Sequence, residues 1–209
     1  MKNVTELKHP IIEHKLSILR NEKTSTKEFR EIIKEISMFL CYEAIKDAKL
    51  DEVEIKTPLT KMKTHRLNED QYAFLPILRA GLGMVDGVID VIPNAKIGHV
   101  GMYRNEHTYE PVNYYFKVPK DISKREAIIL DPMLATGGSA CDAIELLKGK
   151  GVEKIKFLCI ISAPEGLKRV TKTYPDVKIY TASIDEKLNE NAYIVPGLGD
   201  AGDRIYGTK

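Results

Sequence analysis

The sequence predicts an α/β fold in which a mostly parallel sheet is flanked by helices, with N-terminal helices and a small hood. Two observations carry this prediction. From Val53 onward, short apolar runs alternate with segments of helical length, which is the order that β-α-β units produce. Before Val53, apolar residues recur at helical spacing. The chain has no internal repeat or low-complexity linker, so we expect one domain, 1–209.

Two helices are expected in the first fifty residues. Pro10 suits the first turn of a helix, and apolar residues follow it at helical spacing as far as Leu19. Ser25 and Glu28 then form a capping-box pattern. The apolar residues after it recur every three or four positions and form one stripe, which consists of Phe29, Ile32, Ile33, Ile36, Phe39 and Leu40. This stripe is expected in the core or in a contact between subunits.

Apolar runs bounded by turns or helices are expected to be the strands, and they lie at 72–78, 96–103, 127–130, 154–161 and 177–180. Helices are expected between them at 83–92, 138–147 and 165–174. Two stretches interrupt the alternation, at 56–68 and 105–117. Both are expected to project from the sheet as a hood or lid, and His107 is expected to be a lid or surface histidine.

Composition excludes several classes of protein. Apolar residues make up 43% of the chain and charged residues 30%, as in ordinary soluble globular proteins. The net charge of +2, from 32 basic and 30 acidic residues, lacks the basic field of a nucleic-acid binder. Cys41, Cys141 and Cys159 are widely spaced, which disfavours disulfides and a zinc site and favours buried reduced thiols.

A membrane partner is also not expected. No stretch reaches the ~20 apolar residues that a bilayer span requires, and the N-terminus has no apolar core of signal-peptide length. These observations predict a cytoplasmic protein.

The chemistry is expected in the loop that follows the 127–130 strand. This loop runs from Asp131 to the pair Gly137 and Gly138 and then into a helix. Glycines allow close approach of the backbone, and a helix N-terminus supplies unpaired N–H groups, so the geometry suits a phosphate. The acid needs donors, and ribose hydroxyls are its natural partners. The loop is therefore predicted to hold a 5-phosphoribosyl group, the alternative being a plain turn with a capping Ser139.

The same loop resembles that of a known family. Its residues are Asp131, Pro132, Met133, Leu134, Ala135, Thr136, Gly137, Gly138 and Ser139. They resemble the loop with which type I phosphoribosyltransferases bind 5-phospho-α-D-ribose 1-diphosphate (PRPP). Most of that superfamily has a second acid after the first, whereas the uracil phosphoribosyltransferase family has a proline, as here. The resemblance implies the type I phosphoribosyltransferase fold and the conversion of uracil and PRPP to UMP and diphosphate, with all these residues contacting PRPP.

Two arginines at predicted strand ends complete the expected PRPP site. Arg79 follows the 72–78 strand and precedes a Gly-rich turn, and its planar guanidinium suits the oxygens of the pyrophosphate. Arg104 ends the next strand, and the resemblance implies that it is a second pyrophosphate contact and a catalytic residue. By pattern alone, a solvated surface residue is the alternative for Arg79, and it is the more common case for an isolated arginine such as Arg104.

The C-terminal tail carries a Gly-rich pattern with two interpretations. Gly197-x-Gly199-x-x-Gly202 matches the dinucleotide fingerprint, but only seven residues remain after Gly202, too few for the helix and the acid ~20 residues on that this motif needs. The segment instead resembles the uracil-recognition loop of the family.

That second resemblance implies particular roles in the tail. Ile194, Gly199 and Ala201 are implied to contact uracil through their backbone groups. Asp200 is implied to lie between base and ribose, where it contacts both uracil and PRPP. It is also the candidate to assist the base N–H or a magnesium-bound water, because the sequence offers no conventional nucleophile.

The resemblance has further implications for cofactors and partners. It implies Mg²⁺, bound mainly through the pyrophosphate of the substrate, and a homodimer or higher homo-oligomer. GTP is an effector in parts of the family, although no residue of this sequence identifies a site for it. Two alternatives stay open: a regulator of the same fold that binds RNA, which the near-neutral charge disfavours, and a transferase for another base such as hypoxanthine or orotate.

Overall fold

The computed structural model describes residues 1–104 and 111–208. The strands of its central sheet are Val4–Glu6 (β1), Tyr72–Leu78 (β4), Lys96–Ile97 (β5), His99–Arg104 (β6), Pro111–Lys117 (β7), Glu126–Leu130 (β8), Met133–Leu134 (β9), Ile155–Ser162 (β10) and Lys178–Ile184 (β11). They lie in the order β1, β11, β10, β8, β4, β6, β7, while β5 pairs with β4 and β9 with β10. Every pair is parallel except β6 with β7, which confirms the predicted α/β fold.

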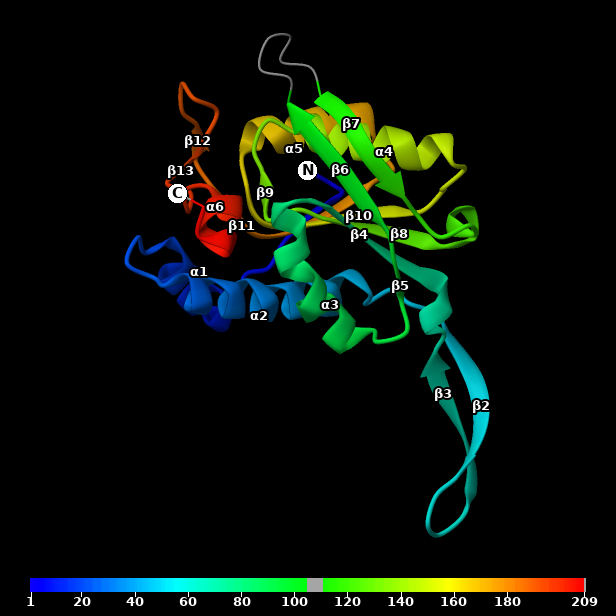
Figure 1. Ribbon diagram of the computed structural model, residues 1–209. Helices are drawn as coiled ribbons and strands as arrows, with labels where there is room; N and C mark the ends of the chain where they lie inside the picture. Colours follow the sequence, from blue (N-terminus) through cyan, green and yellow to red (C-terminus); the bar gives the residue numbers. More distant parts are fainter. Residues whose placement is uncertain (105–110, 209) are drawn as a thin grey trace.

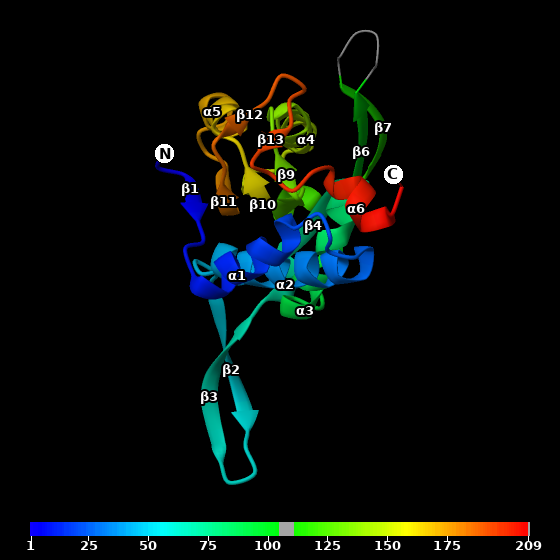
Figure 2. The same cartoon turned by 90° about the vertical axis from the view of Figure 1, so that its left-hand side faces the viewer.

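Helices cover both faces of this sheet (Figures 1 and 2). One apolar cluster joins the sheet to α1 (Pro10–Arg20), α2 (Thr26–Ala44), α3 (Val85–Val91) and α6 (Ala201–Tyr206). The other cluster joins it to α4 (Gly138–Gly149) and α5 (Pro164–Thr173). Because strand side chains alternate between faces, Phe74 lies in the first cluster and Leu75 in the second. Among the described helices, none is long and apolar enough to cross a membrane.

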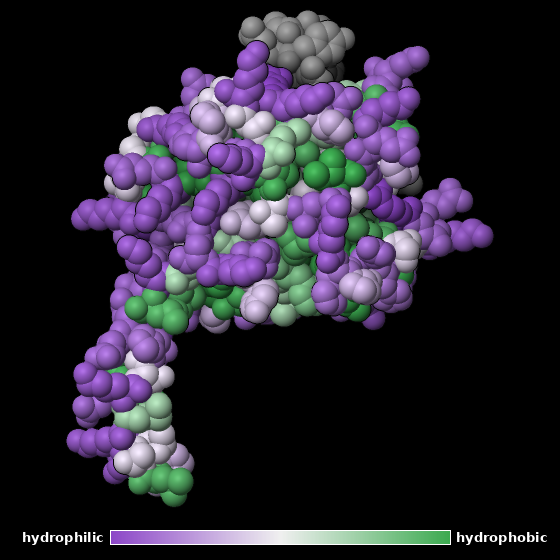
Figure 3. All heavy atoms as spheres, turned by 180° about the vertical axis from the view of Figure 1, so that it is seen from behind, coloured by the Kyte–Doolittle hydropathy of each residue, from purple (hydrophilic) through white to green (hydrophobic). Residues whose placement is uncertain are grey.

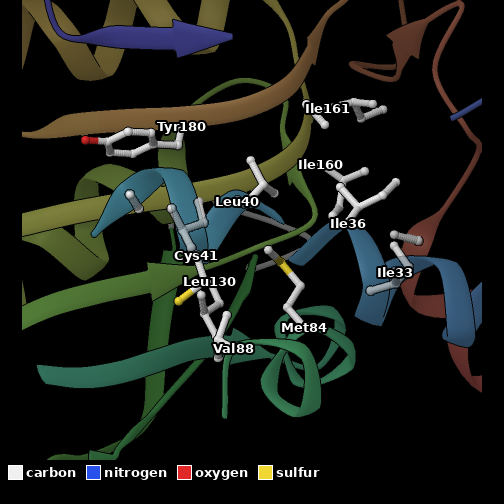
Figure 4. Close-up of a cluster of buried hydrophobic side chains, with 14 of the residues drawn as sticks. Ile33, Ile36, Leu40, Cys41, Met84, Val88, Leu130, Ile160, Ile161 and Tyr180 are labelled. Atoms are coloured by element: carbon white, nitrogen blue, oxygen red, sulfur yellow. The ribbon is translucent and has the colours of Figure 1, made fainter. Parts of the chain in front are cut away.

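The N-terminal helices form where the sequence predicts them. Pro10 is the first residue of α1, and the Ser25 hydroxyl accepts a hydrogen bond from the Glu28 amide at 3.2 Å to cap α2. The predicted stripe of α2 is buried except for Phe39, which is 38% exposed. Figure 4 shows part of this stripe with Leu40 directed into the first cluster. The strand β1 was not predicted, because its three residues gain their partner only in β11.

Two predicted elements of the α/β region are divided in the structure. The 96–103 run becomes β5 and β6, separated at Gly98, whose amide donates to the Phe74 carbonyl at 2.9 Å. The predicted helix 83–92 begins earlier, as the 3₁₀ helix Ala80–Met84 (η2), and continues as α3. The other predicted strands and helices of this region agree with β4, β8, β10, β11, α4 and α5, although β11 extends to Ile184.

The segment expected to form a hood at 56–68 is instead part of a long hairpin. β2 (Leu50–Lys56) and β3 (Lys61–Leu67) pair antiparallel and project from the body (Figures 1 and 2). The hairpin projects as predicted, but it leads into the amino-terminal end of β4, so it forms no lid over the opposite edge of this sheet. Of the second expected lid, 105–117, the last part is β7, whereas 105–110, His107 included, lie outside the described residues.

Candidate active site

Three neighbouring parallel strands bring the predicted site residues to one edge of the sheet. Pro76 of β4 pairs with Leu130 of β8, so Arg79 and Asp131 follow strands that end side by side. β6 pairs with β4 on the other side and ends at Arg104. The backbones of these residues therefore lie on the carboxyl-terminal side of the sheet, where open α/β sheets bind ligands, although β6 continues beyond Gly101, the partner of Leu78, before it reaches Arg104.

The loop from Asp131 to Ser139 begins as a short strand, which sequence analysis did not predict. β9 pairs with β10, and the Leu134 carbonyl accepts a hydrogen bond from the Ala163 amide at 2.9 Å. Because Leu134 is only 2% exposed, it offers a ligand its backbone alone. The loop then turns at Gly137, whose φ of 78° is the left-handed conformation that favours glycine.

The start of α4 forms an anion cradle. Gly138 is the first residue of this helix, and its amide donates to the Thr136 hydroxyl at 3.4 Å. The first amides of a helix have no intrahelical acceptor and carry partial positive charge. Arg169 of α5, which sequence analysis missed, adds a cation: its Nη1 lies 3.7 Å from the position that a Cβ on Gly138 would take. This arrangement suits a terminal phosphate.

Asp131 is held by its backbone, while its carboxylate has few partners. Its amide donates to the Leu158 carbonyl at 3.1 Å. Among the described residues, the carboxylate accepts one hydrogen bond, from the Met133 amide at 3.3 Å. Burial raises the pKa of the Asp131 carboxyl to about 7, and the Met133 bond opposes this rise only in part. A partly buried acid with a single hydrogen bond gains from hydroxyl donors, and a ribose diol supplies two.

The Arg79 turn packs directly against the end of β8. A Cβ on Gly81 would lie 2.3 Å from the Leu130 carbonyl oxygen, so only glycine permits this approach. Arg79 itself is exposed and follows a cis peptide bond. The Tyr206 hydroxyl donates to the Arg79 carbonyl at 2.9 Å, and the guanidinium lies 5.7 Å from the centre of the Tyr206 ring. The helix α6 therefore holds this turn.

The C-terminal tail is an ordered strand, turn and helix. β12 (Lys187–Leu188) pairs with β13 (Ile194–Val195), and a cis bond between Val195 and Pro196 follows. Gly197 and Gly199 have φ values of 66° and 79°, which explains the glycines of the predicted pattern. The short helix α6 begins inside that pattern and ends at Tyr206.

The tail lies next to the Arg79 turn and presents mainly backbone. Ile194 and Ala201 are 6% and 0% exposed, so their side chains belong to the core. The Asp200 Oδ1 atom accepts from the Asp203 amide at 2.8 Å and caps α6. A Cβ on Gly202 would lie 3.9 Å from the Cβ of Ala80, the residue after Arg79. The structure thus brings the expected base loop and the expected pyrophosphate arginine together.

Sequence analysis also missed a glycine that shapes the loop from Asp131 to Ser139. A Cβ on Gly166 of α5 would lie 2.4 Å from the Ala135 carbonyl oxygen and 3.0 Å from that of Leu134. Any side chain here would push the loop away from α5. A lone glycine inside a helical pattern is the signal that marks such a close approach.

The expected Mg²⁺ can be compared with the donors present. Among the described residues, no group of three or more His, Cys, Asp or Glu side chains is placed to hold a metal. The predicted site contributes only the carboxylates of Asp131 and Asp200. Because Mg²⁺ commonly uses one or two carboxylates together with substrate phosphates, these donors fit a cation that enters with a diphosphate.

The chain matches known proteins over nearly its whole length. Residues 6–208 match the family model described as uracil phosphoribosyltransferase. The uracil phosphoribosyltransferase of Clostridium botulinum (strain Eklund 17B / Type B) is 60% identical over 209 residues, covering 100% of both chains. The solved structure of the AQ2163 protein from Aquifex aeolicus is 43% identical, with a TM-score of 0.92 and coverage of 99% of each chain.

A more distant structure agrees in fold. The adenine phosphoribosyl transferase of Trypanosoma brucei, solved with AMP, pyrophosphate and ribose-5-phosphate, is 12% identical, with a TM-score of 0.62 over 96% of this chain and 89% of that chain. The predicted fold is therefore that of the type I phosphoribosyltransferases. Together with the full-length match at 60% identity, these findings show that the chain belongs to the uracil phosphoribosyltransferase family, a family of pentosyltransferases.

Proposed function

We propose that this protein transfers the 5-phosphoribosyl group of PRPP to uracil, forming UMP and releasing diphosphate in pyrimidine salvage. The observation that carries the proposal is the meeting of three parts at one sheet edge. These parts are the anion cradle at the start of α4, the Arg79 turn and the tail that ends in α6. The cradle is proposed for the phosphate, the Arg79 turn for the leaving diphosphate, and the tail for the flat base.

The 5′-phosphate is proposed to lie in the cradle. The amides at Gly137 to Ser139 donate to it, with the Thr136 hydroxyl at the rim and Arg169 nearby. The Asp131 carboxylate then accepts hydrogen bonds from the ribose hydroxyls, which compensate for its burial. Phosphate and sugar are thus bound by two ends of one loop, and this fixes the direction of the anomeric carbon.

The leaving diphosphate is proposed to contact Arg79, with Arg104 as its second cation. The bond from the anomeric carbon to the diphosphate oxygen breaks while the bond to uracil N1 forms and the N1 proton passes to Asp200 or to water, so negative charge grows on the leaving group. Guanidinium groups at that position stabilise the transition state electrostatically. When bound with the diphosphate, Mg²⁺ would neutralise part of the same charge, and Asp131 and Asp200 are the carboxylates that would hold it.

Uracil is proposed to contact the backbone of Ile194, Gly199 and Ala201. Its alternating carbonyl and N–H groups match main-chain amides and carbonyls. Because Asp200 Oδ1 already caps α6, Oδ2 is the oxygen that we assign to the ribose, to the N1 proton or to a magnesium-bound water.

A turnover assay with PRPP and Mg²⁺ tests the proposal, with uracil, hypoxanthine and orotate offered separately. UMP is expected from uracil, and failure to form it would overturn the proposal. The variant Arg79→Gln is expected to lose most activity. Lys154→Gln is the matched control, because Lys154 is also an exposed cation but precedes β10 at the opposite edge. GTP is also proposed as an effector, and adding it to the same assay tests whether it raises the rate of UMP formation.

A homodimer or higher homo-oligomer is also proposed. The α1 and α2 surface has a groove of 420 Å³, beside which Phe39 and Tyr42 are 38% and 72% exposed. The hairpin has no core of its own, and Leu59 at its turn is 95% exposed; apolar surface is visible at its end in Figure 3. Pairing with a second copy would bury such surfaces. Light scattering of the purified protein tests this proposal.

The cytoplasm is the proposed location. Cys41, Cys141 and Cys159 are all buried free thiols, as expected for a protein of a reducing compartment. Cell fractionation tests this location.

A further inference from the structure

A buried ion pair lies beneath the tail, outside the set of residues assigned to ligands. Arg20 is the last residue of α1 and Asp185 follows β11. The guanidinium donates from Nη1 to Asp185 Oδ2 at 2.7 Å and from Nη2 to Oδ1 at 2.6 Å. This two-point fork fixes the relative orientation of both groups. The Asp185 side chain is only 1% exposed and that of Arg20 23%.

The ion pair forms hydrogen bonds with both the carbonyl and the amide of Gly197 in the tail. Arg20 Nη1 also donates to the Gly197 carbonyl at 2.7 Å. The Gly197 amide in turn donates to Asp185 Oδ2 at 2.9 Å. Gly197 has a φ of 66°, and a Cβ there would lie 2.0 Å from the Ile194 carbonyl oxygen. The turn between the two ends of the expected uracil loop is therefore fixed by the ion pair.

Other contacts of the pair keep it charged and oriented. The Ser183 hydroxyl accepts from Arg20 Nη2 at 3.1 Å and donates to Asp185 Oδ1 at 2.9 Å. Burial alone would raise the pKa of Asp185, but hydrogen bonds from Arg20, Gly197 and Ser183 bring it below the ordinary value. Asp185 is therefore ionised at neutral pH.

The end of α1 also holds the next residue of the tail. Arg204 donates to the Leu198 carbonyl at 2.8 Å and to the Leu19 carbonyl at 2.7 Å. Successive tail carbonyls, those of Gly197 and Leu198, are thus tied to the last two residues of α1. A buried ion pair often adds little net stability compared with apolar residues of similar volume. What this one does supply is a defined position for the turn.

We propose that Arg20 and Asp185 are positioning residues for uracil, holding Gly197 so that Gly199 and Ala201 present their backbone groups to the base. This inference rests on the proposed assignment of the tail to uracil. Asp200, the one group assigned to both substrates, has its own support in the hydrogen bond from the Asp203 amide. The other groups assigned to PRPP also have separate supports: Tyr206 holds the Arg79 turn, and β10 holds the Asp131 backbone. Loss of the pair should therefore act on uracil and leave PRPP binding nearly unchanged.

The test is steady-state kinetics of Arg20→Gln, Asp185→Asn, the double variant and Arg20→Lys. The KM for uracil is expected to rise about tenfold in each single variant, since a displaced loop loses aligned contacts, while the KM for PRPP changes less than about twofold. The KM for uracil of the double variant should not exceed that of the more impaired single variant, because both residues act through Gly197. Arg20→Lys keeps the charge but not the two-point fork, so its KM for uracil should lie between those of the wild-type protein and Arg20→Gln.

A matched control comes from the same helix. Lys15→Gln breaks a partly buried ion pair between α1 and Glu35 of α2 that has no contact with the tail. It should leave both KM values unchanged. If Arg20→Gln lowers only the melting temperature, or raises the two KM values equally, the pair is structural and the positioning role is overturned.

A separate readout distinguishes this failure from failure of the uracil assignment. Hydrogen exchange of the wild-type protein with UMP should protect the amides of 194–201. Absence of that protection would overturn the assignment of the tail itself, and the positioning role with it. Protection together with an unchanged KM for uracil in Arg20→Gln would leave the assignment intact and overturn the positioning role alone.

Discussion

Replacing Asp131 by asparagine is expected to make the protein more stable and less active. Burial raises the pKa of this carboxyl from 3.8 to about 7 in the folded state, whereas the unfolded chain keeps the ordinary value. Because Asp131 keeps partial access to solvent, holding the ionised carboxylate destabilises the fold by at most about 4 kcal/mol. Asparagine has nearly the same shape, its oxygen still accepts from the Met133 amide, and it carries no charge.

The pH dependence of this effect has a definite sign. Below about pH 4 the carboxyl is protonated in both states, and above about pH 7 it is ionised in both. Between these values the folded state binds more protons, so the stability of the wild-type protein falls relative to Asp131→Asn as pH rises. The advantage of the variant in free energy of unfolding should grow by about 2–3 kcal/mol from about pH 5 to about pH 8.

Urea denaturation at both pH values measures the stability, and steady-state kinetics measures the activity. The kcat/KM for PRPP should fall about 100-fold, because hydrogen bonds from two ribose hydroxyls to a charged acceptor are lost. Asp176→Asn is the control: its pKa is lowered by the exposed ion pair with Lys148, so its effect should be small and of opposite sign. A stability difference that does not change with pH, or an unchanged kcat/KM for PRPP, would refute the reasoning.

Three further changes test other parts of the site. Tyr206→Phe removes the hydrogen bond to the Arg79 carbonyl and should raise the KM for PRPP about fivefold while the KM for uracil stays constant; the reverse pattern would contradict the role given to α6. Gly166→Ala, whose Cβ would lie 2.4 Å from the Ala135 carbonyl oxygen, should lower the free energy of unfolding by about 1–3 kcal/mol and weaken PRPP binding, as denaturation and kinetics would show. Leu59→Ser should shift the oligomer toward smaller species in light scattering, and an unchanged mass would remove the hairpin from the interface.

Local patterns predicted the elements whose cause is local. The helix α2 has its own cap at Ser25 and its own apolar stripe, and β4 and β8 are apolar runs long enough to be identified alone. The positions of Asp131, Arg79 and Arg104 at one edge follow because parallel strands end together. The resemblance of the PRPP loop then supplied the chemistry that periodicity could not.

What the sequence did not reveal depends on partners distant along the chain. β1 becomes a strand only because β11 pairs with it, and β9 only because β10 does. Arg20 and Asp185 are 165 positions apart, and neither stands in a pattern that marks a site. The hairpin was expected to be a hood. A charged, Thr-rich stretch shows that a segment leaves the core, but it does not show from which edge of the sheet the segment leaves.

Two charged groups at opposite ends of the sheet, Lys156 and Asp131, differ in how far the protein itself supplies their hydrogen-bond partners. At the amino-terminal end, the ammonium group of Lys156 is 4% exposed and lies 2.6 Å from Asp47, 2.7 Å from Glu126 and 2.6 Å from the Ala44 carbonyl. That charge is fully satisfied within the chain. At the carboxyl-terminal end, the Asp131 carboxylate accepts a single long hydrogen bond from the described residues and has a raised pKa. The Asp131 carboxylate therefore still has acceptor positions for ligand hydroxyls, whereas all three protons of the Lys156 ammonium group already have partners.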